Sequence, residues 1–596
     1  MDYNETSKAN AITNDIECIQ LTEIYSENEE DSITLQIDED DGKNSESFSN
    51  AEQVSDFWCT DNQMPNVENF LAFPGMKETI PDSALGFIQL FISRELLEHL
   101  LIETNKYARQ FQSSHENKSK EWKPVTLTEL AKYLGLTVLM GIVQLPEIAM
   151  YWALNEKYGQ PVFYQTMSYK RYIEINKYFH FNDNENISTE NSDRLFKIRP
   201  VITYLLSRYK KVYVPKQELS LDEGQMPWRG RLGFKVYNPL KPDKYGVKFY
   251  ILAEAKSGYV VNFEIYSGKS SSTHDLVLRL TENLKNKYYK LYMDNYYNSV
   301  KLAEALLTNK IYCCGTLRLV RGAPKDIQAF SKSKIPHDST IFKRKGNVFI
   351  ILWKDKRVVN MISTCNNAET EKVEKKMKIK NKKDGSTSYK TLTLNKPKAI
   401  CDYNKYMKGV DHLDQMTSYY KFARKSYKWT KKIVMYMLQM ALHNSFVLYN
   451  KFSNSSKPLS LLEFHKLFYE ALINFTVEEW PFTGHSVLQN ALQPVSDETI
   501  TCVAMEDVST STGENNTKRV TARRKAGNRI IDPPTRLQKR IRHDLVLLTK
   551  RKRCRVCYKS GERKDTKYEC VTCKIPLCPA PCNINYHKLT QYWKKK

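Results

Sequence analysis

The sequence feature that most constrains the fold is a change of hydrophobic period near residue 216. Upstream, from Pro81 onward, apolar residues recur every three or four positions, which is typical of helices. In "YGVKFYILAEAKSGYVVNFEIYSG", apolar and polar residues alternate on both sides of the turn at Lys256, Ser257 and Gly258, which predicts a β-hairpin of long strands. Further on, "KLYMD" and "IYCCGTLR" read as strands with a helix, "NSVKLAEALLTNK", between them. We therefore expect a mixed α/β sheet within a largely helical protein.

The size and charge of the chain restrict its partners. At 596 residues, with 41% hydrophobic residues, it should form several folded domains. The formal net charge of +24 favours a polyanionic partner, because clustered Lys and Arg displace counterions from phosphates. No apolar run is long enough for a membrane span, so no membrane partner is expected. The N-terminal sequence does not resemble a secretory signal, which predicts a reducing compartment.

Three polar segments stand apart from the globular pattern. The acidic stretch around "IYSENEEDSITLQIDEDDGKNSES" predicts disorder, either as a solubilising tail or as a mask for a basic surface. The lysine-rich "ETEKVEKKMKIKNKKDGSTS" predicts a flexible basic loop in an inserted β-containing module. The basic stretch from "KRVTARRKAGNRI" to "TKRKRC" fits a nuclear localisation signal, a DNA contact, or both.

Three acidic residues stand where a metal site would need them. Asp222, in "LSLDEGQMPWRGR", and Asp294 are each expected at the end of a strand, and Asp411 near the start of a helix. Neighbouring strands and a helix packed on them could gather these carboxylates around two Mg²⁺ ions, which is the arrangement that catalyses phosphoryl transfer. Asp414 would share the helix face of Asp411 as a fourth ligand or supporting group. Taken alone, an Asp at a strand end is more often a solvated turn residue, and Glu223 should point to the other strand face as a structural residue.

The C-terminal segment "CRVCYKSGERKDTKYECVTCKIPLCPAPCNINYH" has the spacing of a zinc module. Two C-x2-C pairs are separated by twelve residues and are followed by two more thiols and a histidine. Each pair presets two thiolates of a tetrahedral site, which favours zinc over disulfides in a reducing compartment. The candidate zinc ligands are Cys554, Cys557, Cys570, Cys573, Cys578, Cys582 and His587.

Four motifs in this order resemble the catalytic core of piggyBac-type DDD/DDE DNA transposases, in particular the vertebrate and bat branch. They are "SLDEGQMPWRGR", "KPDKYGVKFY", "YMDNYYNSV" and "DYNKYMKGVDHLDQM", and the resemblance extends from about residue 65 to 590. It implies an RNase H-like catalytic core whose acidic triad is Asp222, Asp294 and Asp411, with Asp414 matching a further Asp of the family pattern. The cofactors implied are two Mg²⁺ or Mn²⁺ ions.

The activity that the resemblance implies is cut-and-paste DNA transposition in the nucleus. A homodimer would bind the terminal inverted repeats of a transposon in double-stranded DNA, excise it through hairpin ends and insert it at TTAA targets. The alternative is a domesticated relative that binds DNA or chromatin without cutting it. The intact acidic triad favours the enzyme.

The same resemblance implies a domain layout for the whole chain. Helical segments on both sides of the catalytic core would together form a dimerisation and DNA-binding domain. The expected ranges are 1–69 (acidic and disordered), 70–217 and 421–495 (dimerisation and DNA-binding), 218–318 and 397–420 (catalytic), 319–396 (insertion domain), 496–550 (basic flexible linker) and 551–596 (zinc domain).

Candidate DNA contacts also follow from the resemblance. Trp429 matches a family tryptophan that could stack on an unpaired base near the active site, although a buried core tryptophan fits equally. Five cations near the acids could contact phosphates or could be solvated charges on the strand faces: Arg229, Arg231, Lys241, Lys244 and Lys248.

For the C-terminal module, the resemblance implies a cross-brace that binds two zinc ions and terminal DNA. One site would use Cys554, Cys557, Cys578 and Cys582. The second would use Cys570, Cys573 and His587, which leaves it one ligand short. No Cys or His follows His587 in the sequence, so the second ion would be held weakly or by another group.

Overall fold

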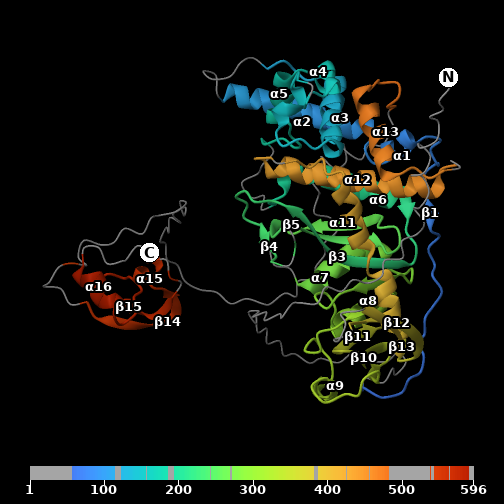
Figure 1. The fold of residues 1–596 in the computed structure, drawn as a ribbon, viewed down its shortest axis with the longest axis vertical. Coiled ribbons are helices and arrows are strands. Elements are labelled where there is room, and N and C mark those ends of the chain that lie inside the picture. The colour runs from blue at the N-terminus through green and yellow to red at the C-terminus, as the bar shows by residue number, and fades with distance from the viewer. Residues whose placement is uncertain are drawn as a thin grey trace, which may run out of the picture. The chain divides into compact units, whose positions relative to one another are not determined.

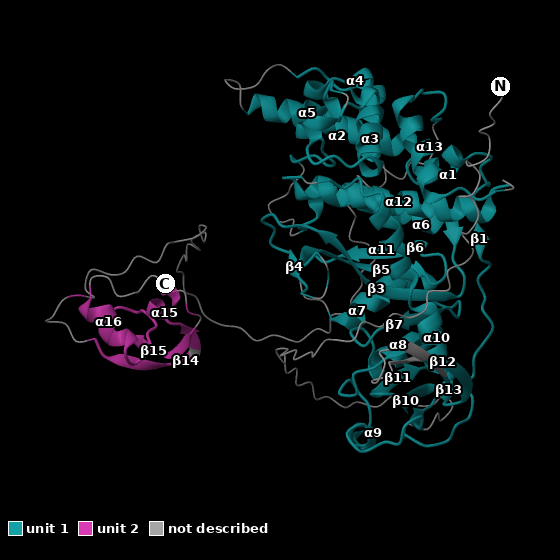
Figure 2. Cartoon of the chain, viewed as in Figure 1, with its two compact units in different colours: residues 1–496 teal, residues 497–596 magenta. Residues whose placement is uncertain are grey.

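The structure is a computed structural model that describes residues 57–481, Leu537 and residues 543–589. Within these ranges, residues 115–121, 156, 186–192, 240, 242, 269–271, 381–386, 425, 455–456, 561 and 563 are not described. The chain divides into two compact units, one within residues 1–496 and one within 497–596 (Figure 2). Most of the predicted acidic N-terminal region and of the predicted basic linker therefore lies outside the described residues.

A nine-stranded mixed sheet forms the centre of the larger unit (Figure 1). Its strand order is β4-β5-β3-β7-β8-β11-β10-β9, and β6 pairs with β5. The strands are β3 (Glu218–Pro227), β4 (Val236–Tyr237), β5 (Tyr245–Glu254), β6 (Val260–Ile265), β7 (Lys290–Met293), β8 (Tyr312–Thr316), β9 (Thr340–Lys345), β10 (Val348–Lys354) and β11 (Val358–Ser363).

The direction of the strands confirms the predicted mixed sheet. β5 runs antiparallel to β3 and β6, so the hairpin expected from the alternating pattern is present. β3, β7 and β8 are parallel to one another, and a helix connects β7 to β8. The expected inserted module does not have a sheet entirely of its own, because β11 pairs with β8 and extends the main sheet through β10 and β9.

Helices cover both faces of this sheet. On one face, Leu219, Leu221 and Leu252 share a core with α7 (Thr273–Thr281) and α8 (Val300–Thr308). On the other face, Met226 and Phe249 belong to a core that includes residues of α11 (Gly409–Tyr419) and α12 (Trp429–Phe452). The short helix α10 (Lys398–Tyr406) precedes α11, and α9 (Lys325–Phe330) follows β8. Because successive side chains of a strand point to opposite faces, each strand contributes side chains to two separate cores.

The second of these cores continues into a helical layer. α12 packs against α1, α6 and α11, and α13 packs against α3 (Figure 1). Thr126 and Glu129 form a capping box at the start of α3, with the Glu129 amide donating to Thr126 Oγ1 at 3.2 Å. No helix in the described part of the chain is long and apolar enough to cross a membrane. The remaining helices of this layer are α1 (Ala84–Gln89), α2 (Arg94–Ser113), α3 (Leu127–Ile142), α4 (Pro161–Thr166), α5 (Tyr169–Tyr178), α6 (Arg199–Val212) and α13 (Leu461–Ile473), with short 3-10 helices at Ile148–Trp152, Phe196–Ile198 and Glu282–Leu284.

The lysine-rich segment is a β-hairpin, so the prediction of a flexible basic loop was wrong for most of it. β12 (Thr370–Lys380) and β13 (Thr387–Pro397) pair antiparallel along their full lengths. Leu394 is buried and Leu392 partly buried against a core that also contains Tyr292 and Ile400. These few apolar anchors hold the base of a ribbon whose lysine content alone suggests a loop.

Residues 57–76 also differ from expectation, because residues 57–69 were predicted to be disordered and are instead packed into the larger unit. Cys59 forms a β-bridge with Arg344, and Trp58 and Phe70 pack against the core beneath the sheet. Phe70 meets Tyr289 edge to face at 4.8 Å between ring centroids. The segment ends in β1 (Gly75–Met76), which pairs with β2 (Tyr213–Val214).

The smaller unit begins before the predicted boundary at residue 551. Its two strands are β14 (Leu545–Arg553) and β15 (Asp565–Cys570), which pair antiparallel. Two short helices, α15 (Arg555–Lys559) and α16 (Cys582–Lys588), complete it. Six buried cysteines lie in its core with Leu577 and Tyr586. Residues 543–550, expected to be linker, therefore belong to the folded unit.

Candidate active site and metal centres

The sheet places Asp222 and Asp294 side by side. β3 and β7 are parallel neighbours whose last paired residues are Leu221 and Met293, and the next residue on each strand is an aspartate. Asp222 does not end its strand as expected, because β3 continues to Pro227 by pairing with β5 alone. Beyond Leu221, β3 loses its parallel neighbour β7, and the backbone of Asp222 stays paired with Ile251 of β5.

Asp411 reaches the same region from a helix. It lies in the first turn of α11, which packs against β3 and β5, and its side chain is exposed. Asp414 is one turn further along α11 and is partly buried, with Lys241 Nζ 4.0 Å from its carboxylate. Among the described residues, no three of these carboxylates have oxygens all within 4.8 Å of one another. The structure thus brings Asp222 and Asp294 together, with Asp411 and Asp414 on the helix that packs over them.

Burial and nearby negative charge make Asp222, Asp294 and Asp414 costly to ionise. The pKa of Asp222 is raised to about 8, first by burial and then by the negative charges of Glu223 and Asp294. Burial and Glu223 also raise the pKa of Asp294, against the stabilising backbone N–H of Tyr296, which donates to Asp294 Oδ1 at 2.9 Å. Burial raises the pKa of Asp414 to about 6. A hard cation would offset this repulsion, so the carboxylates suit Mg²⁺ or Mn²⁺ chemically.

Two residues that the sequence analysis missed set the position of the acids. The Asn298 amide donates to Met293 O at 2.9 Å and to Thr316 O at 3.0 Å, which ties the end of β7 to the end of β8. Gly409 lets α11 approach β3, because a Cβ at this position would lie 2.4 Å from Ser220 Oγ and 2.8 Å from Glu254 O. The "DNYYNS" and "KGVD" contexts contain both residues, but only the three-dimensional contacts reveal their roles.

Glu223 faces away from the side of the sheet on which α11 packs, as expected, yet it interacts with the acid pair. Its backbone N–H donates to Asp222 Oδ1 at 2.8 Å, and its carboxylate lies 3.5 Å from Lys248 Nζ. It adds negative charge near Asp294 as well. Lys248 is therefore paired with Glu223 and lies over the rings of Tyr250 and Tyr296, at 5.3 and 4.8 Å from their centroids.

The other predicted DNA contacts do not form one cluster. Arg229 and Lys244 are exposed and line a cavity of about 520 Å³, while Arg231 is exposed on the same turn. Lys241 and Asp414 line a separate cavity of about 480 Å³. The geometry leaves these cations accessible to a phosphate backbone.

Trp429 is partly buried, which is compatible both with stacking on an unpaired base and with packing in the core. It begins α12, and its ring packs edge to face on Phe234 at 5.4 Å between centroids. It also lies at the edge of the core shared by the sheet and the helical layer. The structure therefore keeps part of the ring exposed and uses the rest for packing.

The smaller unit gathers its cysteines and histidines into two groups. Within each group the potential ligand atoms all lie within 4.8 Å of one another. The seven predicted ligands fall into the two groups that the family resemblance implies. The first group is Cys554, Cys557, Cys578 and Cys582, and the second is His543, Cys570, Cys573 and His587.

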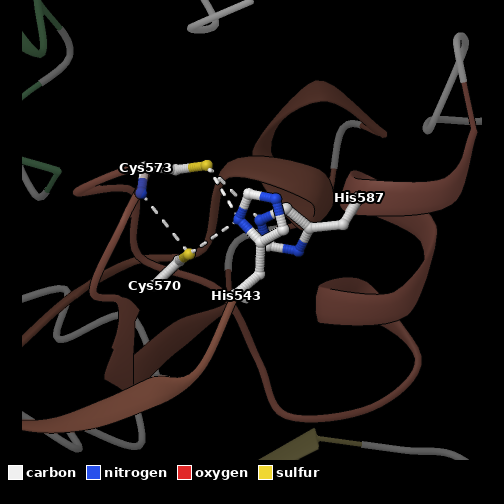
Figure 3. Close-up of side chains that lie close together, drawn as sticks. All are labelled: His543, Cys570, Cys573 and His587. Carbon is white, nitrogen blue, oxygen red and sulfur yellow. Dashed lines mark hydrogen bonds between the residues drawn. The ribbon is translucent and has the colours of Figure 1, made fainter. Parts of the chain in front are cut away.

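His543 supplies the ligand that the sequence analysis did not find (Figure 3). Its Nδ1 lies 3.6 Å from Cys570 Sγ and 3.5 Å from Cys573 Sγ, and Cys573 Sγ lies 3.5 Å from His587 Nε2. A tetrahedral zinc ion with bonds of about 2.0–2.3 Å separates its ligand atoms by about 3.3–3.8 Å. His543 precedes the first cysteine pair and lies outside the cysteine-rich segment whose spacing predicts the zinc module.

Further contacts hold the side chains of the two ligand groups in position for metal binding. His587 Nδ1 lies 2.9 Å from Asn583 O, so that nitrogen donates its hydrogen and Nε2 is left as the metal-facing acceptor. In the first group, Cys557 Sγ and Cys582 Sγ are 3.5 Å apart, and the Cys578 amide donates to Cys554 Sγ at 3.4 Å. Every described cysteine of the chain is a free thiol. The residues present therefore fit two zinc ions.

Comparisons with known proteins agree with this geometry. The family model described as Transposase IS4 matches residues 83–446, more than half of the chain. Human piggyBac transposable element-derived protein 3 is 26% identical over 403 residues, which cover 65% of this chain and 64% of that protein. Human piggyBac transposable element-derived protein 2 is 25% identical over 385 residues, covering 62% of this chain and 61% of that protein. The chain thus spans less than two thirds of the length of either relative.

A solved structure shares the fold over a larger part of the chain. The cryo-EM structure of a piggyBac transposase synaptic complex with hairpin DNA has a TM-score of 0.58 and 20% sequence identity, covering 85% of this chain and 98% of that chain. Together with the family match, the two human relatives and the acid-bearing sheet, this similarity identifies the lineage. The chain belongs to the Transposase IS4 family, in its piggyBac-type branch.

Proposed function

We propose that this protein is a cut-and-paste DNA transposase whose chemistry takes place at Asp222, Asp294 and Asp411. The observation that carries the proposal is the adjacency of Asp222 and Asp294 on parallel strands, under a helix that bears Asp411. Hydrolysis and transfer of a phosphodiester need no protein nucleophile when carboxylates hold the catalytic ions. The reaction would excise a transposon through hairpin ends and insert it at TTAA sequences.

The topology of the sheet supports an RNase H-like core. In the order β6-β5-β3-β7-β8, β5 alone runs opposite to the other four strands. This is the strand arrangement of that fold, and it puts the first and fourth strands, β3 and β7, next to each other. The remaining layout, with a helical dimerisation and DNA-binding domain, an insertion domain around β9–β13 and a C-terminal cross-brace domain, is part of the same proposal.

The residues that would hold the catalytic ions are Asp222, Asp294 and Asp411, with Asp414 as a supporting group. Two Mg²⁺ or Mn²⁺ ions, when bound, would activate the attacking hydroxyl and stabilise the charge that develops on the phosphate. The chain itself contributes position: the sheet fixes Asp222, Asn298 holds the end of β7, and Gly409 sets the approach of α11.

The two ligand groups of the smaller unit would each hold a zinc ion. With zinc bound, this unit would present the basic residues of β14 to DNA, which fits recognition of terminal repeats. Arg229, Arg231, Lys241, Lys244, Lys248 and Trp429 are proposed contacts of the larger unit with DNA. A homodimer in the nucleus is the assembly and location that suit a reaction on two transposon ends.

A DNA-binding or chromatin-binding protein without cleavage activity is the second candidate. The names of the human relatives describe them as derived from a transposable element. Such a protein would keep the fold, the zinc groups and the net charge of +24 while losing the reaction. The intact carboxylates in this chain favour the enzyme, since a binding protein has no need to keep buried acids at a cost in stability.

The test is strand cleavage by purified full-length protein. DNA carrying the repeats that flank the protein's own coding sequence is incubated with Mg²⁺, or with Mn²⁺, and hairpin ends are sought on a denaturing gel. The parent protein and Asp275→Asn, a change at an exposed carboxylate on α7, should both produce hairpins. Asp294→Asn should lower the rate by at least about a thousandfold, because one ligand of the ions is lost.

Binding of the same DNA is measured in parallel by gel shift. Asp294→Asn should bind the repeats as tightly as the parent, so that loss of cutting reports on chemistry. If the parent binds the repeats but yields no hairpin with either metal, the transposase proposal is wrong and the binding protein is the correct reading.

A further inference from the structure

A cavity of about 930 Å³ in the larger unit is lined by Tyr296, two residues after Asp294, and of its lining residues only Lys248 has a role in the function proposed above. It lies between α6, α7 and the edge of the sheet formed by β5 and β6. Its volume is within the range of roughly 300–1,000 Å³ typical of sites for small organic ligands. A DNA duplex, whose major groove alone is about 12 Å wide, is too large to enter it.

The wall of the cavity combines aromatic rings with positive charge. The cations are Arg199, Lys210, Lys248 and Arg279, against a single carboxylate, Glu264, which Arg279 holds with two hydrogen bonds of 3.0 and 3.1 Å. Arg199 is in turn paired with Asp193, outside the wall, through two hydrogen bonds of 2.8 Å, and the lining residues themselves carry more cations than carboxylates. The rings are those of Tyr237, Tyr250, Phe263, Tyr266 and Tyr296.

Two lining residues connect the cavity to the acids. Tyr296 donates its backbone N–H to Asp294 Oδ1 at 2.9 Å, and its ring lies 4.8 Å from Lys248 Nζ. Lys248 Nζ is in turn 3.5 Å from Glu223, the residue next to Asp222. These contacts link the cavity to Asp294 through Tyr296 and to the neighbour of Asp222 through Lys248.

Planar aromatic walls with cations are the chemistry that recognises a nucleotide, since every base has a face for stacking and every phosphate a negative charge. We infer that this cavity receives an unpaired nucleotide of the DNA strand that is processed at the acid pair. The inference rests on the proposed function, because the position of the cavity gains its meaning from a scissile phosphate at Asp222 and Asp294. A free nucleotide would satisfy the same wall chemistry, so the test must separate the two sources.

The experiment measures binding in the absence of divalent metal, where no cutting is required. The probes are a fluorescein-labelled blunt duplex and the same duplex with an extension of about four unpaired thymidines, read by fluorescence anisotropy with full-length protein. The extension should tighten binding by about fivefold or more. Thymidine monophosphate is added as a competitor, and it should displace the extended duplex at least about a hundredfold less effectively than an unlabelled extended duplex.

Two pairs of variants test whether the tighter binding of the extended duplex depends on the cavity. Tyr266→Leu removes a stacking ring and should abolish most of the gain from the extension, whereas Tyr266→Phe should keep it. Lys210→Ala should weaken binding of the extended duplex by about twofold to fivefold, whereas Lys211→Ala, the exposed neighbour that does not line the cavity, should leave it unchanged. Lys210 is exposed, so this pair remains informative if Tyr266→Leu does not fold.

Three results would overturn the inference: no preference for the extended duplex, a preference that survives both Tyr266→Leu and Lys210→Ala, or equal competition by thymidine monophosphate. Failure of the proposed transposase function gives different results from failure of the cavity inference. A protein that never cuts DNA but loses the extension preference in both cavity variants supports the cavity and rejects the transposase. A protein that cuts normally while the variants bind like the parent rejects the cavity alone.

Discussion

At the scale of single residues, the site is a set of acids held where their charge is costly. Asp222 has no cation partner among the described residues, and its neighbours Glu223 and Asp294 are themselves acidic. Its pKa of about 8 means that the folded protein without metal keeps this carboxyl protonated at neutral pH. The same repulsion that destabilises the metal-free protein would favour a divalent cation, which links stability to metal binding.

Replacing Asp222 should stabilise the metal-free protein in a pH-dependent way. The unfolded chain ionises this side chain above pH 3.8, whereas the folded chain does so only near pH 8, so stability falls as pH rises through this window. Asp222→Asn has no proton to lose, and its melting temperature should exceed that of the parent by an amount that grows from pH 5 to roughly 2–4 °C at pH 8.

Differential scanning fluorimetry in buffer without added divalent metal measures this difference. Asp275→Asn is the control, because its hydrogen bonds to Ser272 and His274 lower the pKa of Asp275, and its removal should give no gain. A melting difference for Asp222→Asn that stays constant or shrinks from pH 5 to pH 8 would show that Asp222 is not buried among like charges.

At the scale of elements, hydrophobic periodicity predicted most of the framework. The β5–β6 hairpin, the helix α8 and the strand β8 follow from residues that alternate or recur on one face. Periodicity failed for β12–β13, where lysines and threonines occupy most positions and only a few apolar side chains anchor the ribbon. Periodicity also cannot show that β3 continues past Asp222. The continuation depends on pairing with β5, and no residue pattern within β3 reports that pairing.

The close contact between α11 and β3 should be sensitive to a single methyl group. In Gly409→Ala, the new Cβ would meet Ser220 Oγ at 2.4 Å, so α11 must move away from the sheet and take Asp411 with it. We expect a loss of about 1–3 kcal/mol in the free energy of unfolding, measured by urea denaturation, and a matching loss of strand cleavage. The control is Gly233→Ala, whose Cβ would meet nothing within 4 Å. Equal unfolding midpoints for the two variants would contradict the close packing of α11.

At the scale of the whole molecule, the chain consists of two units with separate cores. Composition and the cysteine spacing predicted a basic multidomain protein with a C-terminal zinc module, and the resemblance predicted the pairing of ligands into two groups. His543 escaped prediction because an isolated histidine eleven residues before Cys554 has no spacing signature. Only the pairing of β14 with β15 brings the chain before Cys554 back to Cys570, and His543 with it.

Removing His543 should cost the smaller unit one zinc ion. The full-length protein is expected to hold two zinc ions, measured by atomic emission after desalting, and His543→Ala about one, because three remaining ligands bind more weakly than four. The melting transition of the smaller unit should fall while that of the larger unit stays unchanged. His337→Ala, at an exposed histidine of the larger unit, should retain both ions. Two tightly bound zinc ions in His543→Ala would remove His543 from the ligand set.

The position of Asp222 within β3 rather than at its end also affects how this sequence can change over evolutionary time. β3 is paired with β5 on both sides of Asp222, so a deletion or insertion of one residue there would shift the register and exchange the two faces of the strand. Leu221 or Glu223 would then occupy the place of Asp222, and apolar residues would leave both cores. Lineages of this protein should therefore accumulate substitutions in β3 but gain and lose residues only outside Glu218–Pro227.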